Sequence, residues 1–162
     1  MKPLTQDFRK LIEARNKHRV EYLLIGGYAV GIHGQARYTK DFHVWVGTDR
    51  SNAERLAPAL DEFCDLGATP DQLAVKELLV RLGVEPNMVD ILGTIAGVEF
   101  GPSYERRLTI DYHGTPIDVI SLRDLRTNKL ATGRSQDAAD VDNLPDPDDP
   151  ESMAHFGDNL PR

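Results

Sequence analysis

The chain has 162 residues, of which 40% are hydrophobic and 28% are charged, and these values are typical of a single soluble domain with a core of its own. The formal net charge of −7 and the isoelectric point of about 5.2 argue against a large nucleic-acid-binding face, which needs an excess of basic residues, but they leave room for a local basic patch. The single cysteine, Cys64, excludes an internal disulfide, and its position after Phe63 in an apolar stretch predicts a packed thiol.

The sequence contains no recognisable targeting or membrane segment. The N-terminal residues MKPLTQDFRK lack the apolar run of a signal peptide. No stretch approaches the ~18 consecutive apolar residues that a helix needs to cross a bilayer. We therefore expect a cytoplasmic protein.

The first third of the chain predicts alternating helices and strands. Apolar residues recur at helical spacing near the N-terminus, and an apolar run then ends at Gly26 and Gly27, which we expect to form a tight turn. The expected elements are a helix over 4–18, a strand over 20–25, a helix over 28–33, a strand over 41–46 and a helix over 51–63. We expect Ser51 to cap the last helix and Pro58 to kink or break it.

The rest of the chain continues the alternation and predicts a mixed sheet. The expected elements are short helices over 69–75 and 99–107, strands over 78–82, 88–92, 108–112 and 117–120, and helices over 121–130 and 137–144. Together they predict one α/β or α+β domain over 1–144, with a mixed β-sheet flanked by helices. Residues 145–162 are acidic and rich in proline, so we expect a tail that is mobile or lies on the surface.

The stretch that follows the first predicted strand has the features of an anion site. A strand, a Gly-Gly pair and a helix N-terminus present backbone N–H groups, and glycine lets a phosphate approach the backbone closely. Arg37 and Lys40 add positive charge, and Asp41 begins the next predicted strand. A Gly-Gly pair alone is usually only a turn, but with these cations and a carboxylate it suggests a nucleotide–metal site.

Longer stretches carry a resemblance to a known family. The string HGQARYTKDFHVWV, the segment PNMVDIL and the segment LRDLRTNKLATGRSQDAADVDNL resemble the polymerase-β-like nucleotidyltransferase superfamily, in particular its small bacterial AbiEii-like or MNT-like branch. The resemblance implies the nucleotidyltransferase fold. Members have a strand–Gly–Gly/Ser–helix motif, a D-x-[DE] strand and a third aspartate on a later strand. Gly26 and Gly27 match the first motif, Asp41 matches the first carboxylate and Asp90 the third.

The resemblance also implies an activity and a set of site residues. The activity is transfer of a nucleoside monophosphate from an NTP to an RNA or protein acceptor, assisted by Mg²⁺. The residues implied for phosphate binding are Gly26, Gly27, Arg37, Thr39, Lys129 and Arg134, and those for metal binding are Asp41, His43 and Asp90. Three further acids are weaker candidates: Asp118, which competes with Asp90 from another predicted strand, and Asp137 and Asp140, which share a helix face and either orient the cations or face water.

His43 departs from this pattern. It stands where the family has its second carboxylate, and alternate residues of a strand share a face, so an imidazole replaces one metal ligand. Imidazole is neutral near pH 7 and a poor Mg²⁺ ligand, whereas Mn²⁺ tolerates it better. We therefore expect impaired two-metal catalysis. Three interpretations stay open: a degenerate site that still binds nucleotide, a Mn²⁺-dependent or single-metal reaction, and an engineered change.

The possible partners follow from these alternatives. An active protein would bind an NTP and an RNA end or a protein. An inactive one would be a nucleotide- or partner-binding module, such as an antitoxin-like protein that neutralises a cognate toxin. The chain is short for a transferase with its own recognition domain, so a homodimer or another protein is a candidate for completing the site.

Overall fold

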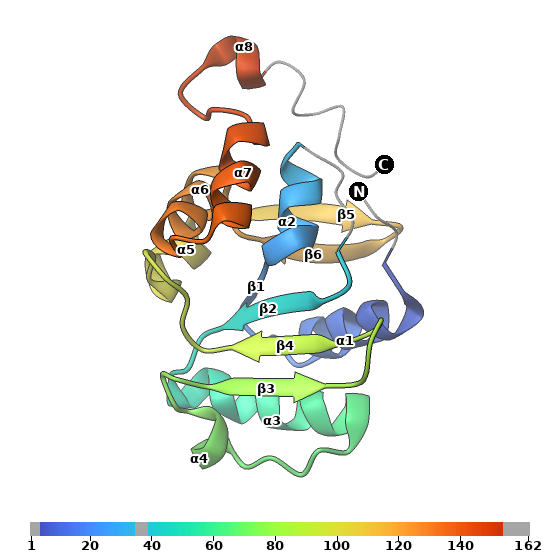
Figure 1. Cartoon of the computed structure of the whole chain (residues 1–162). Coiled ribbons are helices and arrows are strands. Elements are labelled where there is room, and N and C mark those ends of the chain that lie inside the picture. The colour runs from blue at the N-terminus through green and yellow to red at the C-terminus, as the bar shows by residue number, and fades with distance from the viewer. Residues whose placement is uncertain (1–3, 35–38, 154–162) are drawn as a thin grey trace.

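The computed structural model describes residues 4–34 and 39–153 and contains a mixed six-stranded sheet flanked by helices (Figure 1). The strand order is β3-β4-β2-β1-β6-β5. The strands are β1 Tyr22–Ile25, β2 Phe42–Val46, β3 Leu79–Leu82, β4 Val89–Leu92, β5 Leu108–Tyr112 and β6 Thr115–Val119. The predicted fold class is therefore confirmed.

Helices cover the sheet on both sides. They are α1 Gln6–Lys17, α2 Gly26–His33, α3 Arg50–Cys64, α4 Pro70–Leu73, α5 Phe100–Glu105, α6 Leu122–Ala131, α7 Ser135–Asn143 and α8 Pro150–Met153. In Figure 1, α1 and α3 lie behind strands β2, β4 and β3, whereas α2, α6 and α7 gather above them. Within the described ranges, no helix combines the length and the apolar character that a membrane crossing requires.

The pairing of the central strands sets the geometry of the site. Strand β2 is antiparallel to β1 and parallel to β4, and β4 is antiparallel to β3. His43 therefore lies opposite Ile25 on one side and Asp90 on the other, and Arg81 lies opposite Asp90. This register places Arg81, Asp90, His43 and the start of α2 in one row across the sheet.

Helix α3 differs from its prediction at its start and at Pro58. It begins at Arg50, and the cap is Asp49, whose side chain accepts a hydrogen bond from the Asn52 N–H, so the Ser51 cap was wrong. The helix also continues past Pro58, so the expected break was wrong. Its apolar face is buried against the core, and this burial outweighs the backbone hydrogen bond that proline cannot make.

Two local expectations near the helix ends were also wrong. Cys64 is the last residue of α3 and is exposed, although Phe63 before it packs against the core. Gly26 and Gly27 do not form a separate turn but are the first two residues of α2. Gly26 has φ +68°, and a Cβ there would lie 3.1 Å from Nδ1 of His43, so both backbone and packing favour glycine.

The described part of the acidic C-terminal segment lies against α6. Arg123 forms an ion pair with Asp148, and Nη1 of Arg126 donates to the carbonyl oxygen of Pro145. These contacts position residues 145–149 on the surface of the domain, before α8. Residues 154–162 fall outside the described ranges.

Candidate functional site

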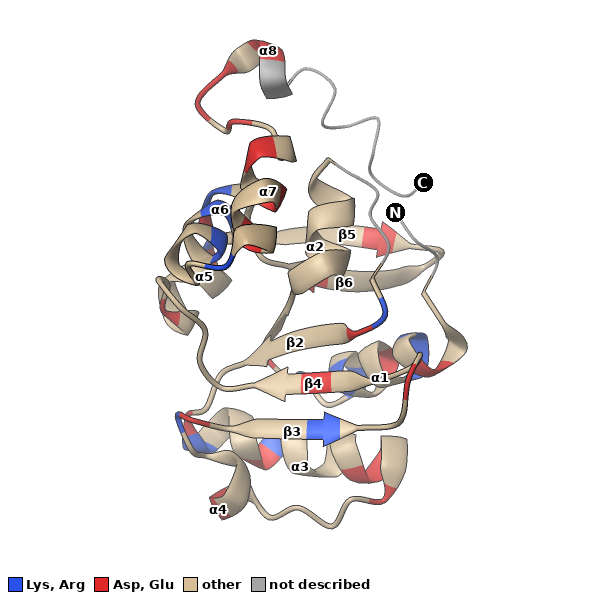
Figure 2. Cartoon of the chain, viewed as in Figure 1, with Lys and Arg blue, Asp and Glu red and all other residues tan. Residues whose placement is uncertain are grey.

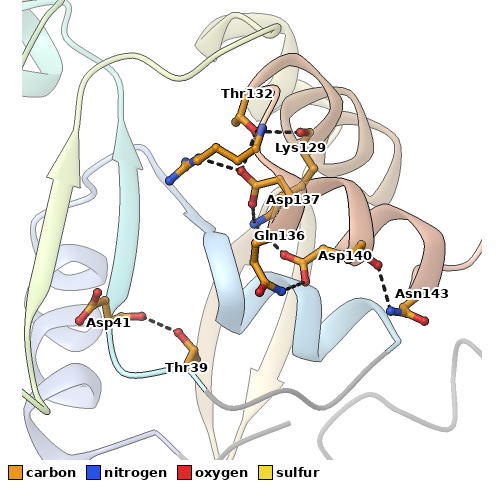
Figure 3. Close-up of polar contacts among 10 residues, drawn as sticks. Thr39, Asp41, Lys129, Thr132, Gln136, Asp137, Asp140 and Asn143 are labelled. Atoms are coloured by element: carbon orange, nitrogen blue, oxygen red, sulfur yellow. Dashed lines mark hydrogen bonds and ion pairs between the residues drawn. The ribbon is translucent and has the colours of Figure 1, made fainter.

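One half of the site, which we call the strand side, consists of Asp41, His43, Asp90 and Arg81. It begins at Asp41, immediately before β2. The Thr39 hydroxyl donates to the carbonyl oxygen of Asp41, a contact of 3.2 Å that is drawn in Figure 3. A Cβ on Gly27 would lie 2.7 Å from the Thr39 side chain, so Thr39 packs directly on the start of α2. Oδ1 of Asp41 is buried and has no hydrogen-bond partner among the described residues. Among the carboxylates of the predicted metal ligands, this oxygen is therefore the buried one without a hydrogen-bond partner in the described residues.

Asp90 is held by an arginine that the sequence analysis did not single out. Nε and Nη2 of Arg81 lie 2.7 and 3.0 Å from the two carboxylate oxygens of Asp90, a bidentate contact. The side chain of Asp90 is 8% exposed and that of Arg81 is 59% exposed. The Arg81 guanidinium holds the pKa of Asp90 below its ordinary value. Figure 2 shows the basic residue of β3 beside the acidic residue of β4.

His43 lies between Asp90 and the start of α2. Its Nε2 is 3.4 Å from Oδ2 of Asp90, and the Nδ1 edge of its ring packs over Gly26. Burial lowers the pKa of His43, and the opposing attraction of Asp90 and Asp41 does not restore it. The ring is therefore neutral at pH 7 and contributes no charge to the strand side.

These residues do not fit a pair of Mg²⁺ ions as they are arranged. Both oxygens of Asp90 accept a hydrogen bond from the positively charged Arg81, and His43 offers an imidazole where Mg²⁺ favours a hard oxygen ligand. Over the described ranges, no three His, Cys, Asp or Glu side chains are grouped as a metal site. Asp41 alone retains an unsatisfied buried oxygen.

The helix side of the site is centred on a buried lysine. Nζ of Lys129 lies 2.8 Å from Asp137 and 3.2 Å from Asp140, and all three side chains are less than a tenth exposed. Thr132 also donates to Asp137, at 2.6 Å, and these contacts are grouped in Figure 3. Burial raises the pKa of Asp137, but the hydrogen bonds from Lys129 and Thr132 outweigh it and leave the pKa below its ordinary value. Of the two predicted roles of the acids, ion pairing with the cations is the one observed.

Arg134 extends this cluster toward solvent. Its Nε lies 3.0 Å from Oδ2 of Asp137, but its side chain remains 77% exposed. Lys129 is thus a buried cation between two acids, whereas most of the Arg134 guanidinium is open to a ligand.

A pocket of about 440 Å³ joins the two sides. Its lining includes five of the predicted site residues, which are Gly26, His43, Lys129, Arg134 and Asp137. They come from α2, β2, α6, α7 and the residue that precedes α7, so chain folding brings together segments more than a hundred residues apart. Thr94, Ile95, Ala96 and Asn128 also line it, and Nδ2 of Asn128 donates to the carbonyl oxygen of Ala96 at 2.9 Å.

The other predicted residues lie beside the pocket, elsewhere, or outside the described ranges. Thr39, Asp41 and Asp90 border the strand side without lining the pocket, and Arg37 falls in the undescribed segment. Asp118 on β6 accepts from the Thr109 hydroxyl at 2.6 Å and pairs with Arg107 at 3.3 Å. This set of contacts is separate from the Asp90 contacts, so Asp118 is not brought together with Asp41.

Arg81 is the functional candidate that the sequence reasoning missed. Two strands around the GVEPN turn were expected, and their antiparallel pairing places residue 81 opposite residue 90. Applying hairpin register to this pair would have identified the contact.

Comparison with known proteins supports the fold. No protein-family model matches the chain, and no curated protein sequence matches it. A crystal structure from Thermotoga maritima, described as that of a "putative nucleotidyltransferase", superposes with a TM-score of 0.57 at 18% sequence identity. The match covers 83% of this chain and 88% of that one. The chain therefore has the fold of that nucleotidyltransferase-like structure.

Proposed function

We propose that this chain is a nucleotidyltransferase-like protein that binds a nucleoside triphosphate in the pocket between α2 and α6. One observation carries the proposal: a single pocket is lined by Gly26 at the start of α2, by His43 and by the two cations Lys129 and Arg134. Backbone N–H groups at a helix start and nearby cations are what a polyphosphate requires. The reaction that we propose for the bound nucleotide is transfer of its nucleoside monophosphate to an RNA end or a protein.

In this proposal the phosphates add a contact to Arg134 and leave the ion pairs within the protein in place. Arg134 is mostly exposed and gains a phosphate without leaving Asp137. Lys129 is already neutralised by Asp137 and Asp140, so it mainly fixes α6 against α7 and adds positive potential to the pocket. The exposed arginine is thus the main cationic contact that we propose for the nucleotide.

The residues of the strand side limit the metal-dependent step of the proposed reaction. The family resemblance assigns Mg²⁺ to Asp41, His43 and Asp90, where it would supply Lewis acidity to the phosphate. Because Arg81 occupies Asp90 and His43 replaces a carboxylate, we propose that transfer in Mg²⁺ is strongly impaired. The protein would then act mainly as a nucleotide-binding module.

A second candidate function is transfer that depends on Mn²⁺. The observation that favours it is the pair of atoms without hydrogen-bond partners among the described residues, Oδ1 of Asp41 and Nε2 of His43. A carboxylate oxygen with an imidazole nitrogen suits Mn²⁺ better than Mg²⁺.

Nucleotide binding is tested first. Equilibrium binding of a fluorescent ATP or GTP analogue to the full chain is measured in EDTA, and competition with unlabelled NTPs defines the preferred base. Arg134→Gln should weaken binding about tenfold, because a charge-assisted contact to phosphate is lost. Arg123→Gln is the matched control, since Arg123 is an exposed arginine of α6 that pairs with Asp148 outside the pocket. Equal losses in both variants, or no binding by the parent chain, would overturn the proposal.

Transfer is then tested with α-labelled NTPs, cellular RNA and lysate, in Mg²⁺ and separately in Mn²⁺. Label transfer by the parent chain in Mn²⁺, abolished by Asp41→Ala, would establish the second candidate. Binding without transfer in either metal would leave the nucleotide-binding module.

A further inference from the structure

We infer that the guanidinium of Arg81 binds Asp90 on the strand side of the site, in the place that a divalent metal ion would otherwise take. Arg81 and His43 then both oppose the binding of a divalent metal ion. Changing His43 alone to aspartate therefore does not restore metal binding. The inference rests on the proposed assignment of Asp41, His43 and Asp90 to a metal-binding strand side.

The geometry of the ion pair supports this role. Arg81 contacts both carboxylate oxygens of Asp90, at 2.7 and 3.0 Å, so each oxygen already accepts a charge-assisted hydrogen bond, and the nearby positive charge opposes the approach of a metal cation. The arginine comes from the strand next to Asp90 and lies opposite it in the register, so its backbone holds the side chain close to the carboxylate. A planar guanidinium matches a carboxylate in two parallel contacts, which a single ammonium group does not.

The charge of the strand side leads to the same conclusion. Asp41 and Asp90 contribute two carboxylates, Arg81 contributes one positive charge beside Asp90, and His43 supplies an imidazole in place of a further carboxylate. The remaining negative charge is too small to attract two dications. Changing His43 to aspartate adds one negative charge, but Arg81 still cancels one and still covers Asp90.

A second ion pair of the same geometry provides a control. Nε and Nη2 of Arg106 lie 3.1 and 2.9 Å from the two oxygens of Asp124, and the side chains are 50% and 6% exposed. This pair matches Arg81 and Asp90 in geometry and burial but comes from α6 and the residue after α5. It lies apart from Asp41 and His43, so its loss should not open a metal site.

The experiment measures Mn²⁺ binding by electron paramagnetic resonance, in the full chain without nucleotide. The variants are His43→Asp, Arg81→Gln, the double variant His43→Asp/Arg81→Gln, and His43→Asp/Arg106→Gln as the control. The double variant should bind Mn²⁺ at least about tenfold more tightly than His43→Asp, the scale of effect seen when the surroundings of a metal site change. The Arg106 control should bind like His43→Asp.

The inference is overturned if His43→Asp alone binds Mn²⁺ as tightly as the double variant, or if the Arg106 control gains the same affinity. Arg81→Lys with His43→Asp is a second test that keeps a positive charge, and it should give an intermediate affinity. Thermal unfolding with and without Mn²⁺ checks that each variant is folded, and the double variant should gain the largest metal-dependent rise in Tm. The metal measurement uses no nucleotide, so failure of the proposed nucleotide binding remains distinguishable from failure of this inference.

Discussion

The two sides of the pocket neutralise their charges in opposite ways. On the strand side a carboxylate, Asp90, is covered by the cation Arg81. On the helix side a cation, Lys129, is covered by two carboxylates, Asp137 and Asp140. On each side, the charged group that the proposed function would use, a carboxylate for metal or a cation for phosphate, is thus already part of an internal ion pair.

The difference lies in what each side leaves open. The helix side keeps Arg134, whose side chain is 77% exposed, so a phosphate can bind there without breaking a buried pair. The strand side keeps a single unsatisfied oxygen of Asp41 and the neutral ring of His43. In the proposed function, phosphate binding and metal binding are therefore separable, because the first uses an exposed cation and the second needs a carboxylate that Arg81 already contacts.

Removing the buried lysine should have the largest effect on stability. Lys129→Met leaves Asp137 and Asp140 buried without their cation, and breaking a buried ion pair costs about 3–5 kcal/mol of unfolding free energy. Urea denaturation monitored by circular dichroism measures the loss. Arg134→Met is the control, because its exposed pair with Asp137 should contribute no more than about 1 kcal/mol.

Equal losses in the two variants would break the comparison, since they would mean that the helix side is not organised around Lys129. A further variant, Lys129→Arg, keeps the charge but not the shape, and should recover part of the loss.

Replacing Gly26, at the junction of the two sides, should have the next largest effect on stability. Gly26→Ala places a Cβ at φ +68° and 3.1 Å from Nδ1 of His43, and the left-handed conformation alone costs about 1–2 kcal/mol in a residue with a side chain. Nucleotide binding should weaken with it, because the start of α2 would shift.

Gly31→Ala is the matched control in the same helix. A Cβ at Gly31 meets no atom within 4 Å, so alanine should stabilise α2 by up to about 1 kcal/mol and leave nucleotide binding unchanged. Nucleotide binding that is unaffected by Gly26→Ala would argue that the phosphates do not reach α2.

The residues of the helix side were predictable from sequence, but the arrangement of the strand side was not. The resemblance named Lys129, Arg134, Asp137 and Asp140, and all four meet in the structure because they lie within a dozen residues on two consecutive helices. Arg81 belongs to no motif of that resemblance. The register of the hairpin around GVEPN indicates that it faces Asp90, but the position of Asp90 beside His43 depends on the pairing of β2 with β4, which only the assembled sheet fixes.

The helix boundaries were missed for a related reason. Asp49 and Ser51 are both of residue types that cap helices well, and it is Asp49 whose side chain accepts from the Asn52 N–H. Pro58 predicts a break in an isolated helix, whereas tertiary packing maintains this one.

The two sides should also lose stability in different pH ranges, which is the smallest effect that we expect. The pKa of His43 is lowered by burial from an ordinary value of 6.5, so as pH falls below that value the unfolded chain takes up a proton that the folded chain does not. Unfolding free energy is therefore retained above about pH 6.5 and falls below it, by at most about 1.4 kcal/mol for each pH unit. Asp137 has a lowered pKa, so its contribution is present above its ordinary pKa of 3.8 and is lost only as pH falls further.

Urea denaturation at a series of pH values separates the two ranges. His43→Gln should reduce the dependence between about pH 6.5 and 5 and leave the acid limb unchanged, since imidazoles titrate in the upper range and carboxylates in the lower one. His33 must be measured beside it, because burial also lowers the pKa of His33, whose Nε2 lies 2.6 Å from the carbonyl oxygen of Ile120. His33→Gln should remove its own share of the upper range. A profile unchanged in His43→Gln would show that the pKa of the ring is the same in the folded and the unfolded chain, so that burial between Asp90 and Gly26 does not lower it.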